Sequence, residues 1–144
     1  MKFILLAEDG EDDVFFFKRA LERKNIKNPV RVVSDGEEFM EYLIGRGKFA
    51  DRKTYPWPDL IFLDIKMPKR TGLEVLDWLR NKSDLPYVPV IVLSSSGHKP
   101  DLECAYRLGA NSYFVKKGSP ADLEAMLERA AGYWLEVNSI PRPE

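Results

Sequence analysis

The amino-acid sequence predicts an α/β fold in which five parallel strands alternate with five helices and form one doubly wound sheet, a (βα)5 chain. Short apolar runs without alternation, such as residues 3–7 and 60–63, are typical of strands buried on both faces. Each run is followed by a segment with apolar residues at helical spacing. Right-handed crossovers between parallel strands then place helices on both faces of the sheet.

Length and composition fit one globular domain. The chain has 144 residues, of which 44% are hydrophobic and 31% are charged, as expected for a domain with a single core. Lys and Arg number 22 and Asp and Glu number 23, so the net charge of -1 gives no general attraction to nucleic acid or to membranes. We expect one domain over residues 1–137, with a final helix over about 119–137 and a short tail over 138–144.

Features of an exported or membrane protein are missing from the sequence. No apolar run approaches the roughly 18 residues that a membrane span requires. The opening run is too short for a signal-peptide core and is followed at once by acids. The single cysteine, Cys104, has no partner for an internal disulfide. We therefore expect a cytoplasmic protein that binds neither nucleic acid nor membranes.

The first half of the chain contains three of the predicted strands, over residues 3–7, 30–33 and 59–64. Helices are predicted between them, over residues 13–24 and 37–44, because apolar residues recur there every three or four positions. Segment 45–58 holds glycines, prolines and charged residues, so it is the longest predicted loop. Its basic side chains are expected to face solvent: Lys48, Arg52 and Lys53.

The second half completes the alternation of strands and helices. The remaining strands are predicted over residues 89–93 and 112–116. A helix is predicted over residues 73–82, and another begins near Pro100 and ends before Gly109. Ser119 followed by Pro120 is typical of the first turn of a helix and predicts the start of the last one.

Polar residues stand at the carboxyl ends of four predicted strands: Glu8 and Asp9, Asp64, Ser94, and Lys116. The carboxyl ends of parallel strands meet at one edge of the sheet, so these side chains are expected to converge. Capping of the next helix would explain either of the first two acids alone, but not five polar positions at strand ends.

The converging groups predict phosphoryl chemistry with a divalent cation. Three neighbouring carboxylates repel one another, and a set of oxygen ligands without cysteine or clustered histidine favours Mg²⁺ or Mn²⁺. A carboxylate can also act as a nucleophile and form an acyl phosphate. An ammonium and a hydroxyl, such as those of Lys116 and Ser94, can then bind the added phosphoryl group.

With this pattern the chain resembles the receiver domains of two-component response regulators, from Phe3 to about Trp134. The matching motifs are Glu8-Asp9, Asp64 with Met67-Pro68 and Gly72, Ser94, and Lys116 after Tyr113-Phe114-Val115. The resemblance implies a flavodoxin-like fold and a signalling module of a phosphorelay rather than an enzyme. Because no output domain follows Glu144, the chain is similar to the stand-alone regulators.

The resemblance implies that Asp64 accepts a phosphoryl group from a sensor histidine kinase. It also implies that Glu8 and Asp9 hold Mg²⁺, and that Asp64 and the backbone carbonyl of Lys66 complete the protein ligands. Lys116 would pair with the phosphoryl group.

Ser94 and Tyr113 would form the switch pair of such a domain. The hydroxyl of Ser94 would bind the phosphoryl group, and the ring of Tyr113 would turn inward behind it. Packing in the core is an alternative explanation for an aromatic residue at position 113.

A narrower resemblance links the chain to the small regulators that are partnered with bacterial phytochromes. It rests on the segment Trp134-Leu135-Glu136, the ending near Pro141 and the insertion over residues 45–58. It implies a bacteriophytochrome as one candidate kinase. Trp134 fits the core stripe of the last helix, whereas Tyr133 with Leu135 is a candidate homodimer surface.

Two residues depart from the family pattern. Lys117 follows Lys116 where relatives usually have proline, and a cis bond before a non-proline residue costs about 2.5–4 kcal/mol, so we expect a trans bond. Lys66 is larger and more basic than the residue usual at its position. Its side chain either pairs with Asp64 or Glu8 or points to solvent.

Other functions for this topology fit the sequence less well. A phosphatase that forms an aspartyl phosphate needs a second acid two places after the nucleophile, where this chain has Lys66. A flavin or nucleotide binder needs a phosphate-binding loop after the first strand, but segment 8–13 is acidic. A degenerate receiver that is never phosphorylated would not need the intact set of acids.

Overall fold

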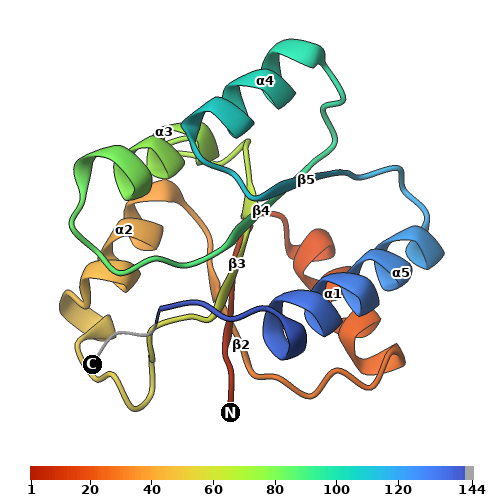
Figure 1. Cartoon of the computed structure of the whole chain (residues 1–144), viewed down its shortest axis with the longest axis horizontal. Coiled ribbons are helices and arrows are strands. Elements are labelled where there is room, and N and C mark those ends of the chain that lie inside the picture. Colours follow the sequence, from red (N-terminus) through yellow and green to blue (C-terminus); the bar gives the residue numbers. More distant parts are fainter. Residues whose placement is uncertain (142–144) are drawn as a thin grey trace.

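The computed structural model describes residues 1–141 and contains one five-stranded parallel sheet (Figure 1). The strands are β1 (Ile4–Ala7), β2 (Val30–Val33), β3 (Leu60–Asp64), β4 (Val90–Ser94) and β5 (Ser112–Val115). They lie in the order β2-β1-β3-β4-β5, with every neighbouring pair parallel. The predicted doubly wound (βα)5 sheet is therefore confirmed. From β1 the chain adds β2 on one side and then β3, β4 and β5 on the other, so the strand order reverses between β1 and β3. Ligands of such sheets bind at the carboxyl ends of the strands at this point.

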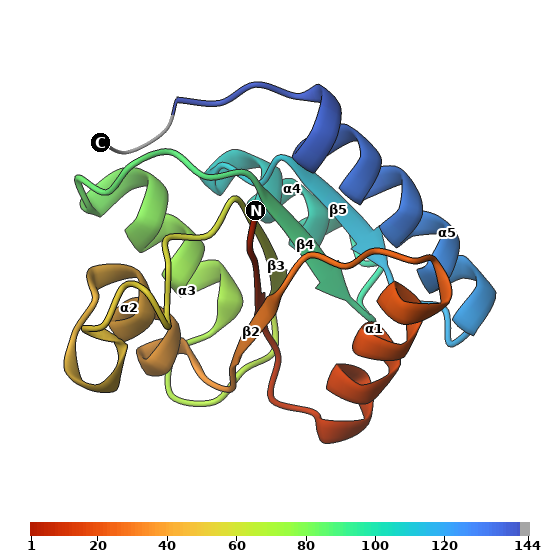
Figure 2. The same cartoon turned by 90° about the horizontal axis from the view of Figure 1, so that it is seen from below.

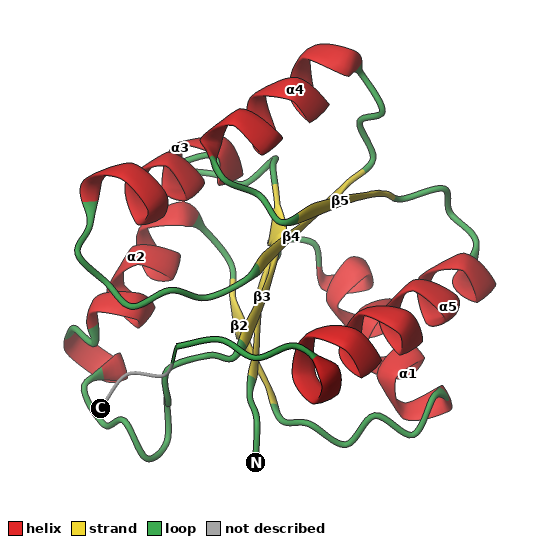
Figure 3. Ribbon diagram, viewed as in Figure 1, coloured by secondary structure: helices red, strands yellow, loops and turns green. Residues whose placement is uncertain are grey.

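Helices cover both faces of the sheet, as Figures 1 and 2 show. On one face lie α1 (Glu11–Arg23) and α5 (Pro120–Ala131). The other face is covered by α2 (Gly36–Ile44), α3 (Gly72–Asp77) and α4 (Lys99–Leu108). The ribbon coloured by secondary structure shows the sheet between these two layers (Figure 3).

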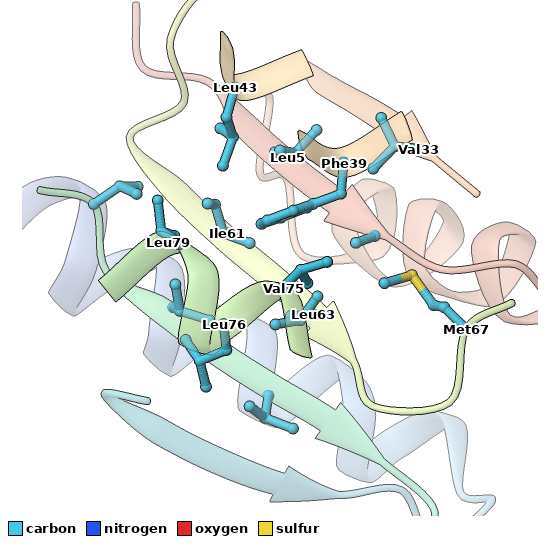
Figure 4. Packing of buried hydrophobic residues seen from close by; sticks show 14 of the residues in the cluster. Leu5, Val33, Phe39, Leu43, Ile61, Leu63, Met67, Val75, Leu76 and Leu79 are labelled. Atoms are coloured by element: carbon cyan, nitrogen blue, oxygen red, sulfur yellow. The ribbon is translucent and has the colours of Figure 1, made fainter. Parts of the chain in front are cut away.

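The sheet divides the hydrophobic core into two clusters, because successive strand residues point to opposite faces. Leu5 and Leu63 face the cluster beneath α2 and α3, together with Phe39 and Val75 (Figure 4). Leu6 and Phe62 face the cluster beneath α1 and α5. The strands are apolar on both faces for this reason, and their runs show no alternation with polar residues.

Three irregular segments extend or follow the predicted elements. The predicted loop 45–58 contains a short 3₁₀ helix, Gly47–Phe49. The helix predicted over 73–82 consists of α3 and a π-helical segment, Trp78–Lys82. The final helix likewise continues from α5 into a π-helical segment, Gly132–Val137. Together these two segments run from Pro120 to Val137. The predicted tail 138–144 extends beyond the described residues.

Two expectations for individual side chains are wrong. Arg52 does not simply face solvent: its guanidinium donates to the backbone oxygens of Tyr42 (2.8 Å), Leu43 (2.7 Å) and Tyr55 (3.1 Å). The first two carbonyls lie in the last turn of α2, where the orphan carbonyls of a helix need partners from outside it. The Tyr42 carbonyl also accepts from the backbone N–H of Gly45 over 3.2 Å.

Leu135 is not available for a homodimer surface, because it is only 4% exposed. It lies four residues after Ala131 and eight after Leu127, and all three face the cluster beneath α1 and α5. Tyr133 remains 50% exposed, and Trp134 packs against the core as predicted.

Within the part of the chain that the structure describes, no helix is long and apolar enough to cross a membrane.

Candidate functional site

Three carboxylates meet at the carboxyl edge of the sheet. Glu8 and Asp9 follow β1 directly, and Asp64 is the last residue of β3. One carboxylate oxygen of each lies within 4.8 Å of the others. Glu8 and Asp64 are buried, with 3% and 8% of their surface exposed, whereas Asp9 is exposed. This set of oxygens can bind a hard divalent cation that enters from the solvent side.

The loop after β3 folds back against the strand and fixes the position of Asp64. A Cβ atom on Gly72 would lie only 2.2 Å from the backbone oxygen of Asp64, so only glycine fits at this close approach. The backbone N–H of Gly72 donates to the carbonyl of Ile65 over 2.7 Å. At the start of the loop, the backbone N–H of Lys66 donates to Oδ1 of Asp64 over 3.2 Å.

Lys116 reaches the carboxylates from the end of β5. Its Nζ lies 2.7 Å from Oε1 of Glu8 and 3.5 Å from Oδ2 of Asp13, in the first turn of α1. Its backbone N–H donates to the carbonyl of Ser94 over 2.7 Å, which anchors it to the end of β4. No peptide bond among residues 1–141 is cis, so the bond from Lys116 to Lys117 is trans as expected.

The electrostatics of this edge favour a bound cation. Burial raises the pKa of Glu8 to about 7, and the charge of Asp64 adds to the rise, while the hydrogen bond from Lys116 opposes it. Burial alone lowers the pKa of Lys116, but its bond to Glu8 and the charges of Asp64 and Asp13 raise it overall. Lys116 therefore stays charged, and a divalent cation would relieve the repulsion that remains among the acids.

Ser94 and Tyr113 both contact Ser96, in the loop between β4 and α4. The fully buried Ser94 accepts a hydrogen bond from the backbone N–H of Ser96 over 3.0 Å. The hydroxyl of Tyr113 donates to the backbone oxygen of Ser96 over 2.8 Å. The ring of Tyr113 is half-buried and packs against the core beneath α2 and α3. Core packing therefore explains part of the environment of Tyr113, and its role in a switch stays a prediction.

The sequence reasoning missed Ser96 as the residue that holds this loop. Its hydroxyl donates to Oδ2 of Asp101 in α4 and accepts from the backbone N–H of His98 over 3.3 Å. Ser96 is buried while Ser95 is exposed. The run of three serines at the end of β4 indicated a polar loop, but only the structure shows which of these serines makes the contacts.

Two lysines near the acids behave differently. The side chain of Lys66 is exposed and forms no ion pair within residues 1–141, so the solvent-facing alternative holds. The side chain of Lys116 forms two ion pairs, and its second partner, Asp13, was also missed by the sequence reasoning. Asp13 belongs to an acidic run in which the sequence alone does not distinguish one member from another.

Comparison with known proteins agrees with this arrangement. The model of the response regulator receiver domain family matches residues 4–128. The chain belongs to this family. As a receiver domain, it is a signalling component of the two-component systems, which operate as phosphorelays.

Several response regulators resemble this receiver domain over nearly their whole length. Response regulator Rcp1 of Synechocystis sp. is 33% identical over 140 residues, which cover 97% of this chain and 93% of Rcp1. The crystal structure of RPA3017, a response regulator in red light signalling of R. palustris, superimposes with a TM-score of 0.92 and 33% identity, covering 99% of this chain and 100% of that one. The phosphorylated cyanobacterial phytochrome response regulator RcpA gives a TM-score of 0.87 at 33% identity, covering 98% and 99%.

Proposed function

We propose that this receiver domain is a cytoplasmic response regulator whose Asp64 accepts a phosphoryl group from a sensor histidine kinase, with Mg²⁺ bound beside it. The observation that carries the proposal is the convergence of Glu8, Asp9 and Asp64, whose carboxylate oxygens lie within 4.8 Å of one another. The ammonium of Lys116 lies at the same edge of the sheet. Phosphorylation of the relative RcpA supports the proposal.

Asp64 is the acid best suited to be the nucleophile. It is at the strand end, and the backbone N–H of Lys66 already orients one of its oxygens. Transfer from a phosphohistidine breaks the P–N bond and forms a P–O bond to Asp64, and the released imidazole then takes up a proton. The product is an acyl phosphate with added negative charge, which the ammonium of Lys116 and the hydroxyl of Ser94 would bind in this proposal.

The residues present fit a hard divalent cation. Glu8, Asp9 and Asp64 would supply carboxylate oxygens, and Lys66 would supply its backbone carbonyl, without cysteine or histidine among the ligands. A bound cation neutralises charge on the transferred oxygens. The Mn²⁺-bound form of the relative Rcp1 supports a divalent ion in such a domain, and we propose Mg²⁺ for this one.

Ser94 and Tyr113 would convert phosphorylation into a change at the surface. Both already bind Ser96, so a shift of the Ser94 hydroxyl toward a phosphoryl group would pull on the loop that also holds Tyr113. A changed loop before α4 would alter the surface that a partner protein meets. The output in this proposal is altered partner binding rather than turnover of an external substrate.

The relatives favour a bacteriophytochrome as the kinase, because RcpA and the regulator RtBRR are described as phytochrome response regulators. We also propose a homodimer through the C-terminal part of the chain, with Tyr133 but not Leu135 at its surface. Tyr133 is 50% exposed and borders a groove between β5 and α5.

Incubation with acetyl phosphate and Mg²⁺, followed by intact mass measurement, tests the phosphoacceptor. We expect one added phosphoryl group on the wild type and none on Asp64→Asn or in the presence of EDTA. Asp84→Asn is the matched control, because Asp84 is exposed in the loop before β4, at the opposite edge of the sheet. An adduct that persists on Asp64→Asn would contradict the assignment of Asp64.

A further inference from the structure

Lys116 has two carboxylate partners at different distances and with different exposure. Oε1 of Glu8 lies 2.7 Å from its Nζ, and Oδ2 of Asp13 lies 3.5 Å away. The side chain of Glu8 is almost fully buried, whereas that of Asp13 is about half exposed. Glu8 is therefore the principal partner of Lys116, and Asp13 is the second.

Both carboxylate oxygens of Glu8 already accept a hydrogen bond. Its Oε2 accepts the backbone N–H of Gly10 over 3.1 Å, while Oε1 accepts the ammonium of Lys116. Each oxygen keeps a further acceptor site, so a divalent cation can bind Glu8, but it places a second positive charge beside the ammonium. The ammonium yields first, because two positive charges on one carboxylate repel each other, whereas the amide carries only a partial charge.

Asp13 lies where the displaced ammonium can go. A cavity of about 220 Å³ beside the acids is lined by Glu8, Asp13 and Lys116, so the lysine head has room to move between its two partners. The carboxylate of Asp13 folds back over the loop and lies 3.2 Å from the place where a Cβ of Gly10 would be. A small movement of Nζ toward Asp13 would shorten the present 3.5 Å contact.

We propose that Asp13 is a positioning residue for Lys116: it holds the ammonium at the mouth of the site while a divalent cation occupies Glu8. Lys116 then remains within reach of the oxygens of Asp64 when a phosphoryl group arrives there. The inference rests on the proposed function, and it adds a residue that is not itself a ligand of the metal. Its energetic consequence is that Asp13 stabilises the cation-bound state more than the cation-free state.

The test compares Asp13→Asn with Asp12→Asn by calorimetric titration with Mg²⁺. Asp12 is exposed in the same helical turn and forms no ion pair within residues 1–141, so both variants lose one charge but only one loses the contact. At about 0.15 M salt the long-range effects of the two substitutions are largely screened. We expect Asp13→Asn to bind Mg²⁺ about two- to fivefold more weakly than Asp12→Asn, as for a half-exposed ion pair.

A double-mutant cycle shows whether the effect passes through Lys116. In the Lys116→Ala background, the difference between Asp13→Asn and Asp12→Asn is expected to vanish. A second readout needs no metal: the NMR titration of the Lys116 ammonium is expected to shift to lower pH in Asp13→Asn but not in Asp12→Asn.

Each outcome decides between the inference and the proposed function. Equal Mg²⁺ affinities of the two variants, or a difference that persists without Lys116, would overturn the inference. The proposed function would still stand if the wild type binds Mg²⁺ and becomes phosphorylated. A wild type that binds no Mg²⁺ would overturn the inference together with the metal part of the proposed function.

Discussion

The hydroxyl of Tyr113 donates a hydrogen bond to the backbone oxygen of Ser96, over 2.8 Å. This bond ties the last strand to the loop between β4 and α4, and the same loop is tied to Ser94 through the backbone N–H of Ser96. A displacement of Ser94 that moves Ser96 would therefore also move the acceptor of the Tyr113 hydroxyl. Ser94 and Tyr113, the two residues that we propose for the switch, thus share Ser96 as a hydrogen-bonding partner.

The substitution Tyr113→Phe removes this hydrogen bond and keeps the ring packed against the core. We expect the free energy of unfolding to fall by about 1 kcal/mol, the typical net contribution of one hydrogen bond. Phosphorylation of Asp64 should persist, because no group at the acid cluster changes. Urea denaturation measures the stability, and intact mass measures the adduct.

Tyr106→Phe is the control for this change. Tyr106 is half exposed on α4, and its hydroxyl makes no hydrogen bond within the described part of the chain. Its stability should equal that of the wild type. If Tyr113→Phe were equally neutral, the bond to Ser96 would contribute nothing to holding the loop.

Replacement of Gly72, a residue in the first turn of α3, should disturb the backbone at Asp64. In Gly72→Ala the added Cβ would lie 2.2 Å from the backbone oxygen of Asp64, so the loop must move. We expect a loss of stability of about 1–3 kcal/mol, as for overpacking in a core, and slower phosphorylation by acetyl phosphate. Urea denaturation and the rate of mass gain provide the two measurements.

A matched glycine supports the interpretation of that experiment. A Cβ on Gly132 meets nothing within 4 Å, and the residue has a helical φ of -60°. Gly132→Ala should therefore be neutral or stabilising by up to about 1 kcal/mol. Equal losses in both variants would show that the close approach at Asp64 is not the cause.

Arg52 should contribute more to stability than its place in a predicted loop suggests. Arg52→Ala removes three hydrogen bonds to backbone oxygens, two of them in the last turn of α2. We expect a loss of about 2 kcal/mol, because three backbone carbonyls lose a hydrogen bond from a charged group. Lys53→Ala, at the exposed neighbouring position, should change the free energy of unfolding by less than about 0.5 kcal/mol. Similar thermal unfolding of the two variants would refute the structural role of Arg52.

The sequence was sufficient to predict the fold and the principal polar residues, because strand ends in a parallel sheet have a fixed relation to one another. Apolar runs identified the strands, and the residue after each run identified what reaches the edge: Glu8, Asp64, Ser94 and Lys116. Topology alone brings such positions together, whatever the details of the loops.

Contacts made within loops were not predictable in the same way. Ser96, Asp13 and Arg52 each lie among residues of the same chemical type, and only the backbone conformation selects the one that makes the contact. Leu135 was placed wrongly because the apolar residues of the last helix form a wide stripe. The sequence does not show which edge of that stripe is buried.

The pH dependence of Mg²⁺ binding should report the titration of Glu8. Burial raises its pKa to about 7, helped by the charge of Asp64 and opposed by the hydrogen bond from Lys116. A cation needs the ionised carboxylate, so protons compete with it below this pKa and affinity falls as the pH falls. We expect binding roughly tenfold weaker at pH 6 than at pH 8, measured by calorimetry.

The variant Glu8→Gln separates this titration from other effects of pH. It removes the ionisable group and one ligand, so Mg²⁺ should bind more weakly at pH 8 and with little difference between pH 6 and pH 8. The comparison requires both proteins at the same salt concentration, because exposed charges nearby are screened by salt. A wild-type affinity that stays constant over this range would mean that Glu8 is already ionised at pH 6, with Lys116 keeping it so across 2.7 Å.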